Sequence, residues 1–360
     1  MIDDRGLASW LQLALTPGLG SSAIRALLGR FGLPENVQAA PVSELAKVVG
    51  ADVAAAIRTG KSSPAVDAAL HWAGERGHAV LTLADADYPR QLLEIPDPPT
   101  LLYAVGRLEL LSQPALAIVG SRNATVQGAH NAEQFARAFS AAGLTIVSGL
   151  ALGIDAAAHR GALGAPGSTI AVLGTGVDIV YPRQHAALAA EIAERGLLLS
   201  EFPLGAAAAA HHFPRRNRLI SGLARGCLVV EAALASGSLI TARAAADQGR
   251  DVFAIPGSIH SPLSKGCHAL IKQGAKLVES AEDVLAELTG FHRTAAATTQ
   301  APTPGEDDPL LTHMGDDPVD VDSLCSRTGL PAERVSADLL RLELDGRVAA
   351  LPGGIYQRLK

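Results

Sequence analysis

The chain has 360 residues, of which 48% are hydrophobic and 18% are charged, and its formal net charge is −6. This length favours two or three domains, since a domain commonly spans roughly 100–200 residues. The acidic total excludes a chain that attracts nucleic acid or anionic lipid over its whole surface, so any polyanion site must be a local patch. The start carries no basic leader and no apolar run reaches the ~18 residues of a membrane span, from which we expect a cytoplasmic protein.

Residues 1–77 show the pattern of several short helices. ThrProGlyLeuGly at 16–20 separates two of them and has the form of a tight helix-hairpin-helix turn. Such a turn can present backbone N–H groups to a phosphate, but the segment up to Gly77 balances seven basic against seven acidic side chains. We therefore predict a small SAM-like or helix-hairpin-helix-like domain, for which a packing role is better supported than DNA contact.

Two strand-and-loop units stand at the centre of the chain. Residues 116–119 and 144–147 are short apolar runs rich in β-branched residues, as expected of parallel strands covered on both faces. The first run leads into GlySerArg at 120–122, and the second leads into Gly149. Neighbouring parallel strands end at one edge of the sheet, where open α/β sheets bind their ligands. Glycine admits a ligand close to the backbone and Arg122 offers a fixed cation, so this edge is predicted to bind a phosphorylated group.

The alternation of strand and helix continues to about residue 290. Apolar strand-like runs recur, with helical stretches between them, at 169–173, 197–203, 227–232 and 251–255. An earlier run at 79–83 is followed by proline-rich residues that we expect to run extended before they enter the sheet. The pattern predicts an α/β fold with a Rossmann-like, doubly wound, mostly parallel sheet over residues 78–290. SerGlySer at 236–238 belongs to the same glycine- and serine-rich edge.

A basic cluster interrupts the acidic chain between two predicted strands. PheProArgArgAsnArg occupies residues 213–218, and residues 207–250 contain six arginines against one Glu and one Asp. Cations along the phosphates and a ring for base stacking are what a single-stranded nucleic acid needs. Pro214 suits a first helical turn, so Arg215 and Arg216 would flank a positive helix end. The alternative is a solvated helix start whose arginines pair with Glu201 or Glu231.

The last part of the chain divides into a linker and a small domain. Residues 291–308 are polar, aperiodic and contain prolines, which predicts a flexible linker. Residues 309–360 show helix, turn, helix and a Gly-Gly hairpin, the pattern of a winged helix-turn-helix. From Glu306 to Lys360 there are eleven acidic and six basic side chains, so a protein-interaction role is better supported than DNA binding.

Motifs that would carry covalent chemistry are sparse. Asp155 and His159 are spaced to share a helix face, as a metal pair or an acid–base pair would be, although a capping Asp and a satisfied, partly buried His are the commoner outcome. No GxSxG elbow and no Walker lysine accompany the glycine-rich loops. The sequence therefore predicts neither a serine nucleophile nor ATP hydrolysis.

Six ordered motifs within residues 88–288 resemble the DNA-processing protein A family, also called DprA or Smf. They are GlySerArg (120–122), SerGlyLeuAlaLeuGlyIleAspAlaAlaAlaHis (148–159), GlyThrGlyValAsp with TyrPro (174–182), PheProArgArgAsnArgLeuIleSerGly (213–222), GluAlaAlaLeuAlaSerGlySerLeuIleThrAla (231–242) and ProGlySer (256–258). The resemblance implies a protein of natural transformation that binds single-stranded DNA without much regard to sequence. It also implies a homodimer through the Rossmann-like domain and the loading of a RecA-type recombinase, with no catalytic residue, cofactor or metal.

On this resemblance the DNA contact falls on the GlySerArg loop and on basic and aromatic residues near it. The candidate DNA-binding residues are Gly120, Ser121, Arg122, Gly149, Phe213, Arg215, Arg216, Asn217, Arg218, Ser236, Gly237 and Ser238. A different class stays open, a nucleotide N-glycosidic hydrolase, because phosphoribohydrolases use a similar sheet. Their glycine loop is followed closely by a glutamate, whereas the loop at 236–241 is followed here by AlaArgAla at 242–244.

Overall fold

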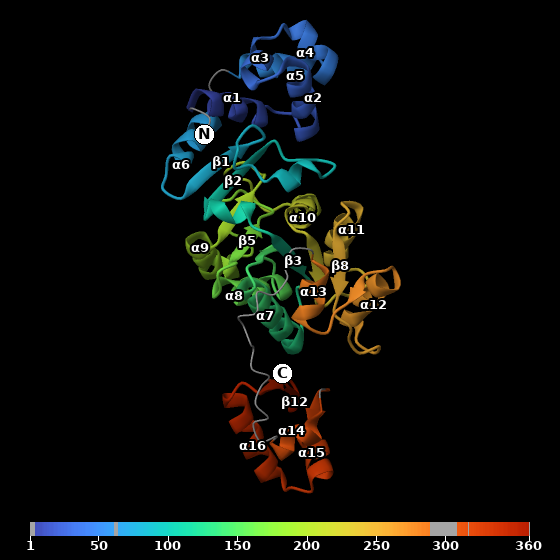
Figure 1. Cartoon of the computed structure of the whole chain (residues 1–360). Coiled ribbons are helices and arrows are strands. Elements are labelled where there is room, and N and C mark those ends of the chain that lie inside the picture. Colours follow the sequence, from blue (N-terminus) through green and yellow to red (C-terminus); the bar gives the residue numbers. More distant parts are fainter. Residues whose placement is uncertain (1–3, 61–63, 289–307, 316, 360) are drawn as a thin grey trace. The chain divides into compact units, whose positions relative to one another are not determined.

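The computed structural model describes residues 4–60, 64–288, 308–315 and 317–359. The chain divides into two compact units, residues 1–124 with 131–288 and residues 289–360 with 125–130. The first unit contains a group of N-terminal helices and a large sheet, and the second contains a small domain with a sheet of its own (Figure 1). Each unit has a separate hydrophobic core.

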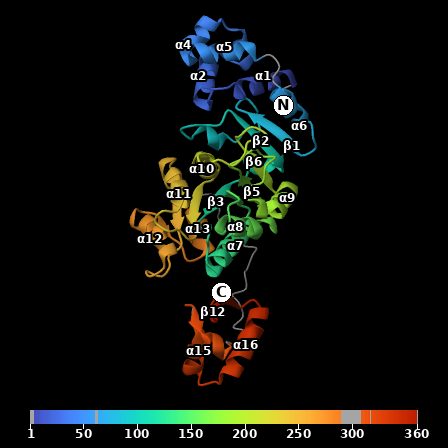
Figure 2. The same cartoon turned by 180° about the vertical axis from the view of Figure 1, so that it is seen from behind.

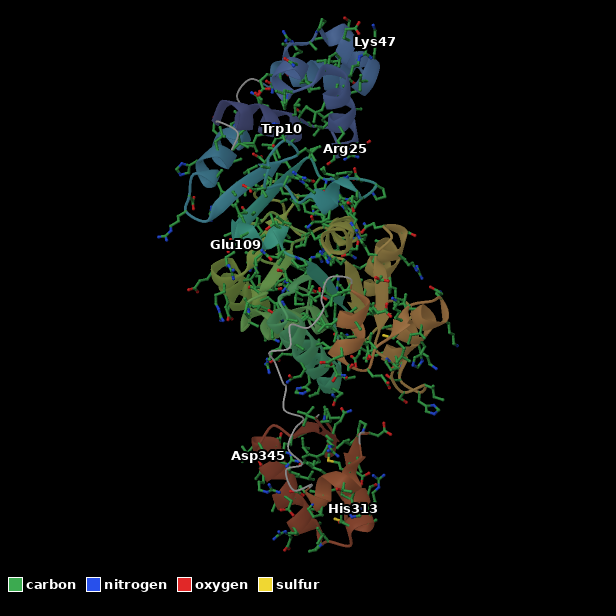
Figure 3. The ribbon with its side chains drawn as sticks, in the orientation of Figure 1. Trp10, Arg25, Lys47, Glu109, His313 and Asp345 are labelled. Carbon is green, nitrogen blue, oxygen red and sulfur yellow. The ribbon has the colours of Figure 1, made fainter. Side chains whose placement is uncertain are left out.

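Six helices form the N-terminal part, here called the helical module. They are α1 (Asp4–Ala14), α2 (Ser21–Phe31), α3 (Pro34–Ala39), α4 (Val42–Val49), α5 (Ala51–Thr59) and α6 (Pro64–Ala73). Gly18, with a φ of +78°, lies in the tight turn between α1 and α2, where a side chain would strain the backbone. Leu27 and its neighbours form a small core of the module. Trp10 of α1 (Figure 3) instead shares a core with Tyr103 of the sheet, which ties the module to the sheet.

The large sheet has nine strands. They are β1 (His78–Thr82), β2 (Leu101–Gly106), β3 (Ala115–Val119), β4 (Thr145–Ser148), β5 (Thr169–Val172), β6 (Leu197–Ser200), β7 (Gly226–Val229), β8 (Asp251–Ala254) and β9 (Lys276–Leu277). Their order is β1-β2-β6-β5-β4-β3-β7-β8-β9, and all pairs from β6 to β9 along this order are parallel. The predicted Rossmann-like sheet is confirmed. β1 and β2 extend it as antiparallel strands, and the prolines before β2 conceal that strand in the sequence.

Helices cover both faces of this sheet. α8 (Ile154–Leu163) and α9 (Ala186–Arg195) pack on one face, whereas α10 (His212–Leu223) and α11 (Ser238–Asp247) pack on the other (Figure 2). Within β5, Ile170 and Val172 belong to the core with α10, and Ala171 between them belongs to the core with α9. The remaining helices are α7 (Val126–Ala141), α12 (Lys265–Lys272) and α13 (Ala281–Glu287). Double coverage explains why the central strands are buried along their whole length.

The second unit is a winged helix, as the sequence predicts. Apart from residues 125–130, its elements are α14 (Pro309–Met314), β10 (Val319–Asp320), α15 (Val321–Thr328), α16 (Ala332–Leu344), β11 (Val348–Leu351) and β12 (Ile355–Arg358). Gly353 and Gly354 both have positive φ and make the turn of the β11–β12 wing. The predicted linker at 291–308 falls, except for Asp308, on residues outside those that the structure describes. Among the described helices, none combines the length and apolar character needed to cross a membrane.

Candidate nucleic-acid interface

A pocket lies at the point where the sheet changes its direction of winding. The chain runs from β3 outward through β4, β5 and β6, and then returns to place β7 on the other side of β3. The loops after β3 and β7 therefore diverge, and open α/β sheets bind their ligands in the crevice between such loops. Here the crevice is a cavity of about 650 Å³ lined by both loops and by the first turns of α10 and α11. We call it the switch-point pocket.

The GlySerArg loop forms one wall of the pocket. The Ser121 N–H donates to the Glu231 carbonyl at 2.7 Å, and the Ser121 carbonyl accepts from the Ile154 N–H at 3.1 Å. A Cβ on Gly120 would lie 2.6 Å from Ile154 Cγ1, so only glycine lets the loop sit between α8 and the loop after β7. With its neighbours fixed in this way, Arg122 is exposed at the pocket.

Arg122 and Phe213 are brought together across a long stretch of sequence. The Arg122 guanidinium carbon lies 5.6 Å from the centroid of the Phe213 ring. Tyr181, whose side chain is 49% exposed, lies against the same ring at a centroid distance of 5.5 Å. The inference that the GlySerArg loop neighbours the basic cluster is therefore confirmed. Tyr181 is not among the candidate DNA-binding residues predicted from the sequence, so this exposed ring was missed.

Arg216 is not a surface residue, which corrects the expectation that it flanks an exposed helix end beside Arg215. It is 4% exposed, and its guanidinium donates to the Gly149 carbonyl at 2.7 Å and to the Val172 carbonyl. Consecutive helical residues point about 100° apart, so when Arg215 faces outward Arg216 turns onto the sheet edge. Burial lowers the pKa of Arg216 to about 10, which leaves it charged at neutral pH.

Gly149 makes room for the buried side chain of Arg216. A Cβ at that position would lie 2.6 Å from the Arg216 guanidinium, so the glycine makes room for the side chain. Asn217 lines the pocket and its Oδ1 accepts from Arg216 Nε at 3.3 Å. The pocket is thus lined by a buried cation, Arg216, which backbone carbonyls hold, and by an exposed cation, Arg122.

Arg215 and Arg218 both pair with Glu201, one of the two partners that the alternative interpretation offers. Glu201 Oε2 accepts from Arg218 Nη2 at 2.7 Å and from Arg215 Nη2 at 3.1 Å. The Arg215 side chain is 45% exposed and the Arg218 side chain is 15% exposed. Of the three arginines in the cluster, Arg215 is therefore the one that a ligand can most easily reach.

The SerGlySer loop forms the opposite wall, at the start of α11. Ser236 and Ser238 share a hydrogen bond of 2.7 Å between their hydroxyl oxygens. Gly237 is the N-cap residue of α11, and space around it is open, since a Cβ there would meet nothing within 4 Å. The Ser238 and Leu239 N–H groups at the start of α11 donate within the loop, to Ser236 Oγ at 3.3 Å and to the Ser236 carbonyl at 3.1 Å, so this wall adds positive potential through the helix dipole.

Asp155 and His159 are both held by hydrogen bonds, as the structural interpretation expects, but Asp155 does not cap α8, whose N-cap residue is Gly153, and His159 is fully rather than partly buried. Asp155 Oδ2 accepts from the backbone N–H groups of Gly149 and Ala151 at 3.1 and 3.3 Å. His159 Nε2 accepts from the Leu150 N–H at 3.3 Å, and Nδ1 lies 2.7 Å from Thr169 Oγ1. Burial lowers the pKa of His159 to about 3, which keeps the ring neutral. Within the described residues, no group of three potential ligands could hold a metal ion.

Comparison with known proteins decides the family. Residues 79–289 match the family model described as DNA recombination-mediator protein A, and residues 294–354 match the DprA winged helix domain. The chain belongs to the DNA-processing protein A (DprA/Smf) family. Protein Smf of Escherichia coli is 45% identical to it over 304 residues, which cover 82% of this chain and 81% of the relative.

Other DprA/Smf proteins agree in sequence and in fold. DprA of Streptococcus pneumoniae is 52% identical over 206 residues, covering 57% of this chain and 73% of the relative. Its X-ray structure covers 77% of this chain and 95% of that chain, with a TM-score of 0.68 and 43% identity. A Helicobacter pylori DNA processing protein A, reported for its single-stranded DNA binding mode, covers 57% of this chain and 93% of that chain, with a TM-score of 0.52 and 32% identity.

The winged helix of this DprA/Smf chain offers a different surface. Arg334 of α16 pairs with Asp338 at 3.0 Å, and Arg341 pairs with Asp308 and, at 3.7 Å, with Asp345. Leu344, on the same helix, is 81% exposed. The arginines of the helix that would enter a DNA groove are thus matched by carboxylates of their own unit, which leaves them poorly available to phosphate.

Proposed function

We propose that the chain binds single-stranded DNA at the switch-point pocket and acts in DNA processing during natural transformation. One observation carries the proposal: the exposed Arg122 guanidinium lies over the Phe213 ring, 5.6 Å from its centroid, at the pocket. A cation for a phosphate and a ring for a base then stand side by side, the combination that single-strand binding needs. The single-stranded DNA binding described for the Helicobacter pylori protein supports the proposal.

The geometry suggests how the strand lies. Phosphates would contact Arg122 and lie near the positive end of the α11 dipole, while unpaired bases stack on Phe213 and Tyr181. Each base–aromatic stack contributes about 1–3 kcal/mol and is tolerant of sequence, because every base has a π face. We therefore expect single-strand binding without preference for particular sequences. A duplex keeps its bases inside, so we expect it to bind more weakly.

We further propose that the chain forms a homodimer through its Rossmann-like sheet and hands the strand to a RecA-type recombinase. The description of the matched family, a recombination mediator, supports this role. A mediator must release its strand, and the exposed cation that we infer to hold the phosphates gives contacts that salt and competing ligands can break. Recombinase loading is tested by adding the protein to recombinase and single-stranded DNA and measuring filament nucleation.

We propose binding without covalent chemistry. Among the described residues that line the pocket, Asp155 carries the one carboxylate, and its Oδ2 already accepts two backbone N–H groups. An N-glycosidic hydrolase needs an acid that can reach the leaving base. Incubation with nucleoside monophosphates tests this alternative, and release of free base would replace the binding proposal with an enzymatic one.

The main experiment measures the affinity for single-stranded and duplex oligonucleotides of equal length across a salt series. We expect the single strand to bind more tightly. Arg122→Ala should weaken single-strand binding roughly fivefold at 0.1 M salt and flatten the slope of log K against log salt by about 0.7, one phosphate contact. Arg137→Ala is a matched control, since Arg137 is an exposed arginine paired with Glu133 on α7. Equal effects of both substitutions, or none from Arg122→Ala, would move the DNA site elsewhere.

A further inference from the structure

The outward side of α16 in the winged helix carries apolar residues. Leu344 is 81% exposed, the largest value among the large hydrophobic side chains that the structure describes, and Leu340 is 57% exposed. Ala337, one turn before Leu340, is exposed as well. These residues are three and four positions apart, so they lie on one side of the helix. We call Ala337, Leu340 and Leu344 the α16 face.

The core of the winged helix does not explain the α16 face. Val335, Leu339 and Leu342 of the same helix are buried and belong to the core of the second unit. Because consecutive helical residues point about 100° apart, Ala337 and Leu344 point away from this buried side. Single exposed leucines are common, but apolar residues grouped on the outward side of a helix are typical of a surface that packs against a partner.

The spacing of the α16 face fits one more helix. Ala337, Leu340 and Leu344 occupy the a, d and a positions of a heptad, the positions that form the seam between two packed helices. The small Ala337 lets a partner helix approach closely, and the two leucines would insert between its side chains. The face spans about two helical turns. It is therefore suited to a short helical segment that presents apolar residues at the same spacing.

The charges beside the α16 face favour a basic partner. Glu333 lies one turn before Ala337 and Glu343 precedes Leu344; both are exposed, and neither has an ion-pair partner among the described residues. The two arginines of α16 already pair with carboxylates of their own unit. A second copy of α16 would bring further glutamates to this face, and like charges across an interface reduce affinity. Lys or Arg side chains would instead give each glutamate a partner.

We propose that the α16 face, with Glu333 and Glu343 beside it, is a docking site for a basic amphipathic helix of a partner protein. The partner helix lays its apolar side on Leu340 and Leu344, and its Lys or Arg side chains pair with the two glutamates. This site lies in the second unit and does not depend on the proposed DNA binding by the sheet unit.

The test uses the full chain and two synthetic helical peptides. One peptide has leucines at its a and d positions and lysines at its e and g positions, and the other has glutamates in place of the lysines. By fluorescence anisotropy, the lysine peptide should bind about tenfold more tightly than the glutamate peptide, the combined effect of two surface ion pairs. Leu344→Ser should weaken binding of the lysine peptide about tenfold or more, because one leucine is no longer buried on binding.

Three variants sharpen the test. Leu33→Ser removes a leucine of similar exposure, 58%, from the helical module and should leave peptide binding unchanged. Replacing Glu333 and Glu343 together by Lys should reverse the preference in favour of the glutamate peptide. Leu344→Met keeps the apolar surface and should bind the lysine peptide nearly as the wild type does, while thermal melting checks that each variant is folded.

Several outcomes would overturn the proposal. They are no saturable binding of the lysine peptide, equal binding of both peptides, and no effect of Leu344→Ser. Self-association of the full chain that Leu344→Ser abolishes would assign the α16 face to a second copy instead. Displacement of the bound lysine peptide by duplex DNA, lost in Leu344→Ser, would assign the face to nucleic acid.

Discussion

The start of α10 and the helix α16 of the winged helix both carry arginines that pair with carboxylates, yet the α10 region adds a buried cation and an exposed cation beside a ring. Around α10, Arg216 is buried under the pocket on backbone carbonyls, and Arg122 remains exposed over an aromatic ring. On α16, Arg334 and Arg341 lie at the surface, each beside a carboxylate. The availability of a cation and a ring beside it, rather than the number of arginines, separates the proposed DNA site from the surface of α16.

The largest expected effect concerns the buried Arg216 and is a loss of stability. Arg216→Met should lower the free energy of unfolding by about 3–5 kcal/mol, because it removes a buried cation from its carbonyls and from the neighbouring Asp155. Chemical denaturation of the full chain measures this. Arg334→Met on α16 is the control and should change stability by less than about 0.5 kcal/mol, as expected for an exposed pair. Similar losses from both substitutions would contradict the contrast between the two regions.

A smaller effect concerns the half-buried ring of Phe213 at the pocket. Phe213→Ala should weaken single-strand binding by about 1–3 kcal/mol, the contribution of one stacked base, while the salt slope stays nearly unchanged because no phosphate contact is lost. Fluorescence anisotropy with a labelled oligonucleotide measures both quantities. The matched control is Leu340→Ala, which removes an exposed apolar side chain from α16 and should leave the affinity unchanged. A flattened slope for Phe213→Ala would mean that the ring positions Arg122 rather than a base.

The smallest effect is a pH dependence confined to the sheet unit. Burial lowers the pKa of His159 to about 3, well below the unfolded value of 6.5. Between these values the unfolded chain binds more protons, so His159 makes stability fall as pH falls, by up to about 1.4 kcal/mol per pH unit, and has no effect above 6.5. Denaturation at pH 6 and pH 5 should show this loss in the wild type, and a smaller loss in His159→Gln. Equal losses would assign the pH dependence to other groups.

Much of the fold follows from local sequence signals. Short β-branched runs that end in Gly or Ser indicate β3, β4, β5 and β7, and the Gly-Gly turn indicates the wing. β9 has two residues, too few to show a pattern, and the prolines before Leu101 conceal β2. These strands form because their neighbours in the sheet supply hydrogen bonds, which a local reading of the sequence cannot reveal.

The candidate site, too, could be predicted from the sequence only in part. Arg122 and the serine–glycine loops could be predicted because glycine-rich strand ends gather at one sheet edge. The burial of Arg216 could not, since its neighbour Arg215 is exposed and the two look alike in sequence. The role of Gly149, which makes room for the Arg216 guanidinium, could not be predicted either, because Arg216 lies far away in the chain. Sequence composition therefore locates the basic cluster but does not separate its supporting cations from its available ones.

Photo-crosslinking tests the central claim most directly. The full chain is bound to a single strand that contains 5-iodouridine, irradiated and digested, and the crosslinked peptides are identified by mass spectrometry. We expect crosslinks at Phe213 or Tyr181, whose rings lie together at the switch-point pocket, and their loss in Phe213→Ala. Crosslinks that fall instead within residues 309–359 and persist in Phe213→Ala would contradict the assignment of the DNA site to the sheet unit.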